Sequence, residues 1–455
     1  MVVAKGRVVL ENGASECHLG ISGGRIAAII DGSEPIPIGH QVIDAKGRIV
    51  LPGGIEPHCH FWDPGEDYRE GWESGTRAAA AGGMTTVIEM PLATPPTVDK
   101  SSFSMKLDIA QRKSLVDFAL WGGVIPDSAP ELEKRILDMR TLGAVAYKVF
   151  MCWSAQTYPP IDDALMLETM RILARHGLMI GIHAENESII RANEARLKSG
   201  QRSDPMAFIE SRPPEAELEA ISRALTLGRI AGAGVHIVHM SIAEGASLIL
   251  KAKQEGQNVS LETAPQYLAL SPDDIVRKGP YAKCAPPLRS KENALRLWER
   301  LLDGTIDFIG SDHAPFTRGE KDAPASFWDV PNGLPGIQDS FSILFSEGVV
   351  KRGMSLERLS ALMSGNAARR FGLYPRKGSL RIGSDADFVI VDPNREWTLL
   401  NEGSFSRAGW TPYEGMKMRG RIEHTILRGQ TVFANGQVIS KPGSGQFVKS
   451  AKGNE

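Results

Sequence analysis

Residues 50–60 read Val50-Leu51-Pro52-Gly53-Gly54-Ile55-Glu56-Pro57-His58-Cys59-His60, an apolar run that ends in two histidines. Side chains two positions apart on an extended segment point to the same side, so His58 and His60 can share one metal ion. A His-x-His pair alone is a weak sign of a metal site. Its meaning depends on which other ligand-type residues the fold brings to the same place.

Four such residues lie in or at the end of other apolar runs: Lys148, His183, His239 and Asp312. Taken singly, the two histidines are explained as satisfied core residues and Asp312 as a helix cap. Two interpretations stand for Lys148. Either its amine reaches solvent from a strand end, or burial and a nearby metal lower its pKa so that it reacts with carbon dioxide. The resulting carbamate would bridge two metal ions.

The middle of the chain alternates strand and helix patterns. Helices are expected between most of the strands, for example over residues 162–176, 214–230 and 243–254. Eight βα units over about 300 residues match an α/β fold, the (β/α)8 TIM-type barrel, which we expect over residues 52–374. A doubly wound open sheet is the alternative. The eight expected strands are 54–61, 85–90, 116–124, 144–151, 178–184, 235–241, 258–264 and 306–313.

Short strands separated by Gly and Asn-Gly turns fill residues 1–51, and the same texture returns near the C-terminus. We therefore expect a small β-sandwich domain built from both termini, residues 1–51 and 375–441. The Gly/Ser/Lys-rich residues 442–455 are expected to form a C-terminal tail.

The barrel explains where the candidate ligands occur. Each lies near the carboxyl end of an expected strand: His58 and His60 on the first, Lys148 on the fourth, His183 on the fifth, His239 on the sixth and Asp312 on the eighth. These ends form one mouth of a TIM barrel, where catalytic groups collect. Unrelated polar residues at five strand ends of one rim are the poorer explanation. The sequence therefore predicts one site with two metal ions.

Two metal ions bridged by a carbamate and a hydroxide supply a nucleophile at neutral pH and polarise a substrate carbonyl. Asp312 is the candidate catalytic residue, because a carboxylate there can take the proton from the hydroxide and deliver it to a departing nitrogen. The expected reaction is hydrolysis of an amide or a related C–N bond. The ligand set suits Zn²⁺, with Mn²⁺, Co²⁺ and Fe²⁺ as alternatives.

Three acidic residues also stand at strand ends: Glu89, Glu185 and Glu262. Either they orient the ligands or they have surface or structural roles. His236 stands three positions before His239, so it faces the other way on a strand, and we expect it to be structural.

Composition and charge exclude several classes of partner. The net charge of −2 gives no reason to expect nucleic acid or an anionic membrane, and no apolar stretch reaches the roughly 18 residues of a spanning helix. The N-terminal residues show no secretory signal pattern. The four cysteines form no CxxC pair, which is typical of free thiols in a reducing compartment. We therefore expect a cytoplasmic protein.

The ligand pattern resembles that of the cyclic amidohydrolases, the group of the amidohydrolase superfamily that contains dihydroorotase, allantoinase, hydantoinase and dihydropyrimidinase. The resemblance runs from residues 52–60 to Gly383-Ser384-Asp385-Ala386-Asp387. It implies a barrel plus a small β-sandwich, a small cyclic amide as substrate, a homotetramer, and a carboxylated Lys148 (N6-carboxylysine) that bridges both metals. It also implies two ligand groups: His58, His60 and Asp312 on one metal, and His183 and His239 on the other.

Four positions bear on the substrate within this group. Dihydroorotases usually carry Arg two residues after His-x-His, where this chain has Trp62. A ring carboxylate would lose its partner there, so dihydroorotase is disfavoured. In hydantoinases the Asn that matches Asn332 helps to bind the imide. The hydantoinase Tyr after the bridging lysine is Trp153 here, and the Ser before Pro-Pro-Leu-Arg is Ala285, which leaves only backbone to bind substrate.

Allantoinases look closer in residues 70–80 and 88–92, and hydantoinases in residues 148–151 and 331–335. We therefore expect an allantoinase-like cyclic amidohydrolase that opens a cyclic amide or ureide ring. Hydantoinase, dihydropyrimidinase or cyclic imide hydrolase comes second. A non-catalytic barrel homologue that serves as a scaffold is the alternative of another class. Loss of metal ligands would be its mark, and none is lost in this sequence.

Overall fold

Short, fully buried strands alternate with helices through the middle of the chain, as in a parallel barrel whose sheet is covered on both faces. The structure, a computed structural model, describes residues 1–155 and 157–451. Its barrel strands are β6 (Gly54–Cys59), β7 (Met84–Glu89), β8 (Asp117–Leu120), β9 (Gly122–Gly123), β10 (Tyr147–Phe150), β11 (Met179–His183), β12 (Gly234–Ile237), β13 (Val259–Thr263) and β14 (Phe308–Ile309). They run in two parallel arcs, β6 to β8 and β9 to β14.

Trp121 joins the two arcs. Its amide donates to the carbonyl of Glu89 at the end of β7, whereas the next amide, that of Gly122, donates to the carbonyl of Ala146 beside β10. The expected third strand, residues 116–124, is therefore two strands that pair with different neighbours. At the other seam the amide of His60 donates to the carbonyl of His313 at 2.7 Å, which closes the barrel.

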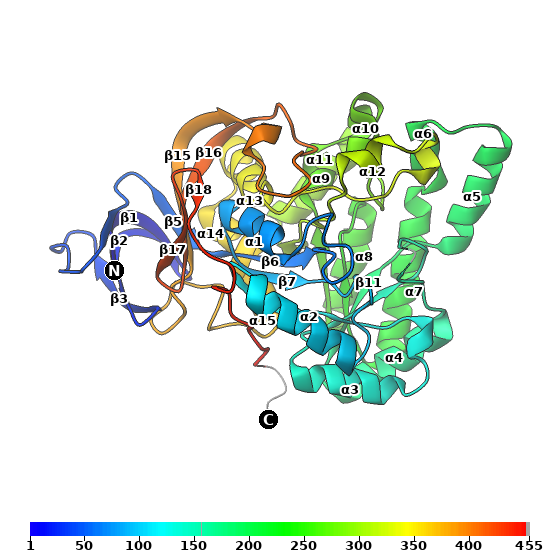
Figure 1. The fold of residues 1–455 in the computed structure, drawn as a ribbon, viewed down its shortest axis with the longest axis horizontal. Helices are drawn as coiled ribbons and strands as arrows, with labels where there is room; N and C mark the ends of the chain where they lie inside the picture. The colour runs from blue at the N-terminus through cyan, green and yellow to red at the C-terminus, as the bar shows by residue number, and fades with distance from the viewer. Residues whose placement is uncertain (156, 452–455) are drawn as a thin grey trace.

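Helices lie outside the barrel (Figure 1). The larger ones are α1 (Trp72–Ala81), α2 (Lys100–Lys113), α3 (Leu132–Leu142), α4 (Asp163–Arg175), α5 (Glu187–Ser199), α7 (Pro214–Ala231), α8 (Ala243–Gln254) and α11 (Lys291–Leu302). Local signals set their ends: the Asp162 side chain accepts the Leu165 amide at 2.8 Å at the start of α4, and Gly177, with a φ of +62°, follows its end. Within the described residues, every helix is too short or too polar to traverse a lipid bilayer.

Short helices complete the connections between the strands. They are α6 (Pro205–Ser211), α9 (Pro265–Ala269), α10 (Pro272–Lys278), α12 (Arg318–Asp322), α13 (Ser340–Ile343), α14 (Leu356–Ser360) and α15 (Asn366–Arg370). Several of them follow strand ends and so help to build the rim of the barrel.

Both ends of the chain form one nine-stranded sheet beside the barrel (Figure 1). Near its middle, β5 (Ile49–Pro52) pairs in parallel with β1 (Val2–Leu10) and antiparallel with β15 (Phe388–Thr398). Val8 and Phe388 belong to a separate buried core inside this domain. The other strands are β2 (Gly13–Ser22), β3 (Arg25–Asp31), β4 (Val42–Asp44), β16 (Lys417–Leu427), β17 (Gln430–Ala434) and β18 (Gln437–Val438). The predicted class, a TIM-type barrel with a β-sandwich from both termini, is confirmed.

The C-terminal segment and a buried charge cluster tie the two domains together. The amide of Phe118 in β8 donates to the carbonyl of Gln446 at 2.9 Å, and the amide of Val448 donates back to Phe118 at 2.8 Å. Nearby, the Lys377 ammonium lies among three buried carboxylates, those of Asp117, Asp385 and Asp387. Arg428 also pairs with Asp117 and Arg376 with Asp385, so cations of the chain already occupy this acidic group.

Candidate metal centre

The carboxyl ends of the barrel strands open into a cavity of about 270 Å³. All six predicted ligands line it: His58, His60, Lys148, His183, His239 and Asp312. A larger cavity of about 530 Å³ lies at the amino ends of the strands, and its described lining residues include no histidine and no carboxylate. Of these two cavities, the smaller one therefore holds the side chains that could bind a metal.

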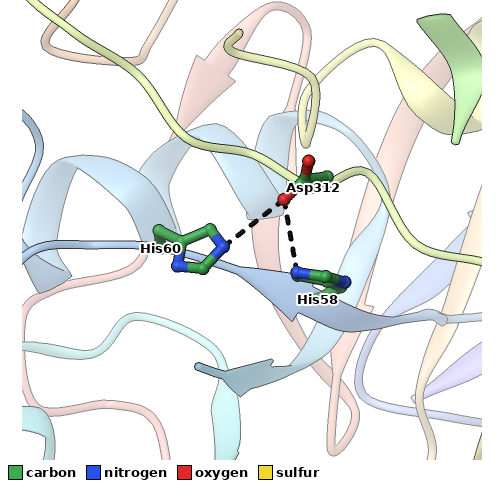
Figure 2. A group of neighbouring side chains, drawn as sticks. All are labelled: His58, His60 and Asp312. Carbon is green, nitrogen blue, oxygen red and sulfur yellow. Dashed lines mark ion pairs between the residues drawn. The ribbon is translucent and has the colours of Figure 1, made fainter. Parts of the chain in front are cut away.

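The first group of ligand atoms comes from the two ends of the barrel domain. His58 and His60 project from the end of β6, and Asp312 follows β14 (Figure 2). Asp312 Oδ1 lies 3.2 Å from His58 Nε2 and 3.4 Å from His60 Nε2. The three ligand atoms all lie within 4.8 Å of one another, so the group could hold a metal ion.

The second group lies beside the first. His183 Nδ1 is 2.9 Å from His239 Nε2, and the His239 ring centroid is 5.2 Å from that of His58. Burial lowers the pKa of both His183 and His239. Burial likewise lowers the pKa of His60 to about 4. Neutral imidazoles are the form that binds a metal.

Lys148 has no exposed surface, and its Nζ finds no hydrogen-bond partner among the described residues. Burial lowers its pKa to about 7, although the charges of Asp312 and Glu262 oppose the shift. A buried amine without an acceptor is costly, and a neutral amine is the form that can add to carbon dioxide. The lysine therefore fits a carbamate between the two groups better than it fits a free ammonium.

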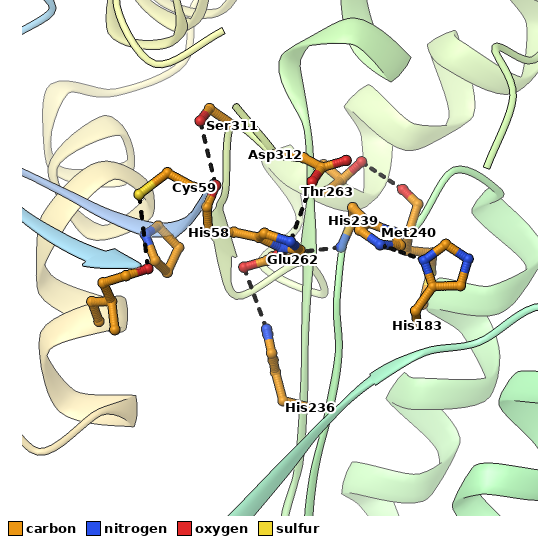
Figure 3. A network of polar contacts seen from close by, with 12 residues as sticks. His58, Cys59, His183, His236, His239, Met240, Glu262, Thr263, Ser311 and Asp312 are labelled. Carbon is orange, nitrogen blue, oxygen red and sulfur yellow. Dashed lines mark hydrogen bonds and ion pairs between the residues drawn. The ribbon is translucent and has the colours of Figure 1, made fainter. Parts of the chain in front are cut away.

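Two buried carboxylates, those of Glu262 and Glu185, stand behind the histidines; Figure 3 shows Glu262 beside His58. Glu262 contacts His58 Nδ1, which leaves Nε2 for the cavity. On the other side Glu185 lies 2.8 Å from His183 Nε2, and the Arg212 guanidinium donates to the same carboxylate at 2.7 Å. Burial opposes ionisation of Glu185, yet Arg212 holds its pKa at about 2. The role that the sequence left open for Glu185 and Glu262 is to orient imidazoles.

Three non-glycine residues of the site have left-handed backbone. The φ angles are +58° for Trp62, +37° for His239 and +49° for Asp312. Such conformations cost free energy and persist where the surrounding structure fixes them, often at functional sites. Here they turn side chains toward the cavity directly after their strands end.

The predicted substrate-binding residues divide into two sets. Trp62, Ala285 and Asn332 line the cavity. Trp153 does not: its side chain is 43 % exposed, it is absent from the residues that line the cavity, and its amide donates to Glu187 at 2.8 Å. The chain turns outward after β10, which an offset counted from Lys148 cannot reveal.

Sequence reasoning missed a charged pair at the cavity, Glu66 and Arg69. Arg69 Nη1 lies 2.9 Å from Glu66, and its Nε donates to Glu320 at 2.7 Å. The guanidinium also lies 5.3 Å from the Trp62 ring centroid and 4.7 Å from that of Phe316. These residues stand in loops, where no periodic pattern marks them. Only the spacing to His58-Cys59-His60 could have drawn attention to the first loop.

Known proteins show the same fold and related sequences. The Amidohydrolase family matches residues 49–432. An allantoinase from Rubrobacter xylanophilus is 41 % identical over 450 residues, 98 % of this chain and 97 % of the relative. An L-hydantoinase from Paenarthrobacter aurescens is 38 % identical over 98 % of this chain and 97 % of its own.

Solved structures agree with these relatives. The L-hydantoinase (dihydropyrimidinase) from Arthrobacter aurescens superimposes with a TM-score of 0.94 at 38 % identity, over 98 % of this chain and 99 % of its own. A dihydropyrimidinase from Brevibacillus agri gives a TM-score of 0.91 at 33 % identity, over 99 % and 98 % of the two chains. The chain belongs to the amidohydrolase family, whose enzymes depend on a binuclear metal centre, and it is a hydrolase of C–N bonds in cyclic amides.

Proposed function

We propose that the enzyme is of the allantoinase type and opens the five-membered ring of a cyclic ureide such as allantoin by breaking an internal amide bond. One observation carries the proposal: six ligand-type residues from five strand ends converge on a single cavity, beside the charged pair Glu66 and Arg69. Relatives that are named allantoinases are similar to this protein along nearly the whole chain, which supports the choice of ring.

The cavity residues fit a binuclear centre. His58, His60 and Asp312 would hold one ion, His183 and His239 would hold the other, and a carboxylated Lys148 would bridge them. Neutral imidazoles, a carboxylate and a buried amine without an acceptor support this assignment. Zn²⁺ suits such ligands best, with Mn²⁺, Co²⁺ or Fe²⁺ as alternatives. When bound, the ions supply Lewis acidity and lower the pKa of water.

Asp312 is the residue that we assign to proton transfer. Its carboxylate faces the cavity and lies against the Nε2 atoms of His58 and His60. It accepts one proton of the attacking water and donates it to the ring nitrogen that leaves, while the carbonyl carbon becomes a carboxylic acid that releases its own proton to solvent. The two transfers cancel, so Asp312 is ionised again after each turnover.

Other cavity residues would select the substrate. Asn332 Oδ1 is buried without a hydrogen-bond partner among the described residues, so it can accept a ring N–H. Ala285 offers only backbone groups. Arg69 can donate to the carbonyl of a ureido substituent and Glu66 can accept its N–H groups, which a hydrocarbon substituent does not provide.

A hydantoinase is the second candidate, and the apolar part of the same cavity favours it. Trp62, Leu92, Phe150 and Phe316 line the cavity and suit an alkyl or aryl substituent. For either activity we propose a homotetramer, on the family resemblance. We also propose a cytoplasmic location, because all four cysteines are buried and free.

The test is a ring-opening panel with the metal-loaded enzyme. Allantoin, an alkyl hydantoin, dihydrouracil, dihydroorotate and a simple cyclic imide are compared by kcat/KM. We expect the highest value for allantoin. Opening of the alkyl hydantoin without opening of allantoin would favour the second candidate. An enzyme that holds about two ions per chain yet opens none of the rings contradicts the proposal, and a metal-free chain points to the scaffold alternative.

A further inference from the structure

Two buried lysines lie behind one wall of the cavity. Lys283 and Lys321 are 1 % and 0 % exposed, and among the described residues no carboxylate lies within 4.0 Å of either amine. Burial lowers the pKa of each to about 7. A desolvated amine of this kind is tolerated only where hydrogen bonds replace water. The hydrogen-bond acceptors of the two amines therefore show which part of the structure the lysines support.

Both amines bind backbone carbonyls of one loop. Lys283 Nζ donates to the carbonyls of Phe327 at 2.7 Å, Trp328 at 3.2 Å and Val330 at 2.6 Å. An ammonium has three donors, so these three acceptors match it fully. Lys321 Nζ donates to the next carbonyl, that of Pro331, at 2.8 Å. The lysines therefore hold two consecutive carbonyls just before Asn332.

The backbone of Lys283 holds the other side of Asn332. Its carbonyl accepts the amide of Gly333 at 3.0 Å. Gly333 itself has no room for a side chain, because an added Cβ would lie 2.4 Å from the carbonyl oxygen of Ala314. The peptide groups on both sides of Asn332 are thus fixed from behind the wall.

The fixed segment faces the substrate cavity. Pro331, Asn332 and Gly333 all line it, as does Ala285, two residues after Lys283. The carboxamide oxygen of Asn332 has no partner of its own among the described residues. Its direction therefore depends on the backbone that carries it, and both amines hydrogen-bond to that backbone.

We propose that Lys283 and Lys321 are positioning residues, which do not touch the substrate but hold residues 330–333 so that Asn332 can bind a cyclic amide. The inference rests on the proposed function for its substrate, although the loop contacts stand without it. Removal of the amines should weaken binding of the ground state and transition state alike, which raises KM and leaves kcat nearly unchanged.

The variants Lys283→Met and Lys321→Met test the proposal, with KM measured on whichever ring the wild-type enzyme opens. We expect KM to rise about three- to tenfold, the range for one hydrogen bond, with kcat within about twofold and the metal content per chain unchanged. Lys283→Gln keeps two donors and should recover part of the loss. Leu301→Ala, at a buried position of α11 that does not line the cavity, is the control that destabilises the fold but keeps KM.

A double-mutant cycle separates positioning from general destabilisation. In an Asn332→Ala background, Lys283→Met should raise KM by less than about twofold, because the group that it positions is gone. A full additional increase in that background would overturn the proposal, and so would a wild-type KM in both single variants. If the Met variants do not fold, the Gln variants carry the same cycle: a smaller rise in KM is expected in each single variant and none in the Asn332→Ala background, and a rise of equal size in both backgrounds overturns the proposal.

Amide hydrogen exchange gives a readout that needs no substrate. Exchange in residues 327–334 should quicken in both lysine variants and stay as in the wild type in Leu301→Ala. Unchanged exchange in the lysine variants overturns the positioning role even if the enzyme opens none of the rings tested. Conversely, the wild-type enzyme could open a ring while the lysine variants keep both the wild-type KM and the wild-type exchange rates. That result would leave the proposed function intact and would overturn only the positioning role.

Discussion

His183 Nδ1 lies 2.9 Å from His239 Nε2, while the opposite nitrogen of the His183 ring lies 2.8 Å from Glu185. The imidazole is therefore held by its outer nitrogen, and its inner nitrogen is directed at a neighbour in the cavity. His58 has the same arrangement with Glu262 behind it. Each half of the centre thus has one histidine backed by a carboxylate, and each carboxylate offers a test.

We expect Glu185→Gln and Glu262→Gln each to weaken metal binding about 10- to 100-fold, because a carboxylate behind a ligating imidazole fixes its tautomer and direction. Metal content per chain after dialysis against a graded chelator series measures the effect. Glu299→Gln, on the exposed face of α11, is the control. If both variants keep two ions per chain up to the chelator concentration that removes them from the wild type, the carboxylates do not support metal binding.

Asp312→Asn should lower kcat at least about 100-fold, since proton transfer by a positioned group contributes about that much or more. The amide keeps an oxygen that can contact a cation but cannot take up a proton. Circular dichroism should show an unchanged fold. Undiminished ring opening in this variant is incompatible with the assignment of Asp312.

Lys148→Met should lose metal together with activity, because the variant cannot form the proposed bridging carbamate. Intact-mass analysis under non-denaturing conditions should show one carbon dioxide per chain on the wild-type enzyme and none on the variant. Lys106→Met serves as a comparison, since Lys106 is equally buried but already paired with Glu89 at 2.6 Å. A wild-type mass without the adduct at full metal loading argues against carboxylation.

Arg69→Met should reduce kcat/KM for allantoin by about 10- to 100-fold, the range for loss of a hydrogen bond to a charged group, and should spare unsubstituted hydantoin. The difference arises because only allantoin carries the ureido group. Arg77→Met, which breaks the ion pair with Glu73 on α1, is the matched control. Equal losses on both substrates would show that Arg69 supports the loop and does not select the substituent.

Stability should depend on pH through Asp339. Burial raises its pKa to about 6, against the hydrogen bond from Thr411. The unfolded chain ionises at lower pH than the folded one, so the contribution to stability is full below about pH 4 and is lost as pH rises through 6. Relative to the wild type, Asp339→Asn should therefore gain about 1 kcal/mol between pH 5 and pH 8. Urea unfolding at both pH values measures this, and parallel curves for the two proteins would refute it.

The barrel and the six ligand-type residues could be predicted from sequence because strand ends in a TIM barrel share one rim. His58 and Asp312 meet for that reason, although the chain between them is long. The split of the third strand could not be predicted, because residues 116–124 look continuous. Only the backbone hydrogen bonds show that the strand changes its pairing partner at Trp121.

The positions of residues outside the strands do not follow from the strand pattern. The offset from Lys148 predicts that Trp153 binds substrate, but the residue is 43 % exposed and does not line the cavity. Glu66 and Arg69 entered the site through a loop whose path depends on contacts with Glu320 and Phe316. Lys283 and Lys321 act through backbone carbonyls, and a sequence carries no mark of which carbonyl a lysine will meet.

The position of β5 has a consequence for synthesis of the chain. Its one edge pairs with β1, which leaves the ribosome early, and its other edge pairs with β15, which leaves near the end. Until residues 388–398 emerge, the nascent chain carries an open sheet edge and a half-built apolar core. Such exposed edges favour intermolecular pairing. The N-terminal strands of this enzyme therefore have to be protected for most of translation. The domain that begins at the N-terminus is completed only when the C-terminal strands have been made.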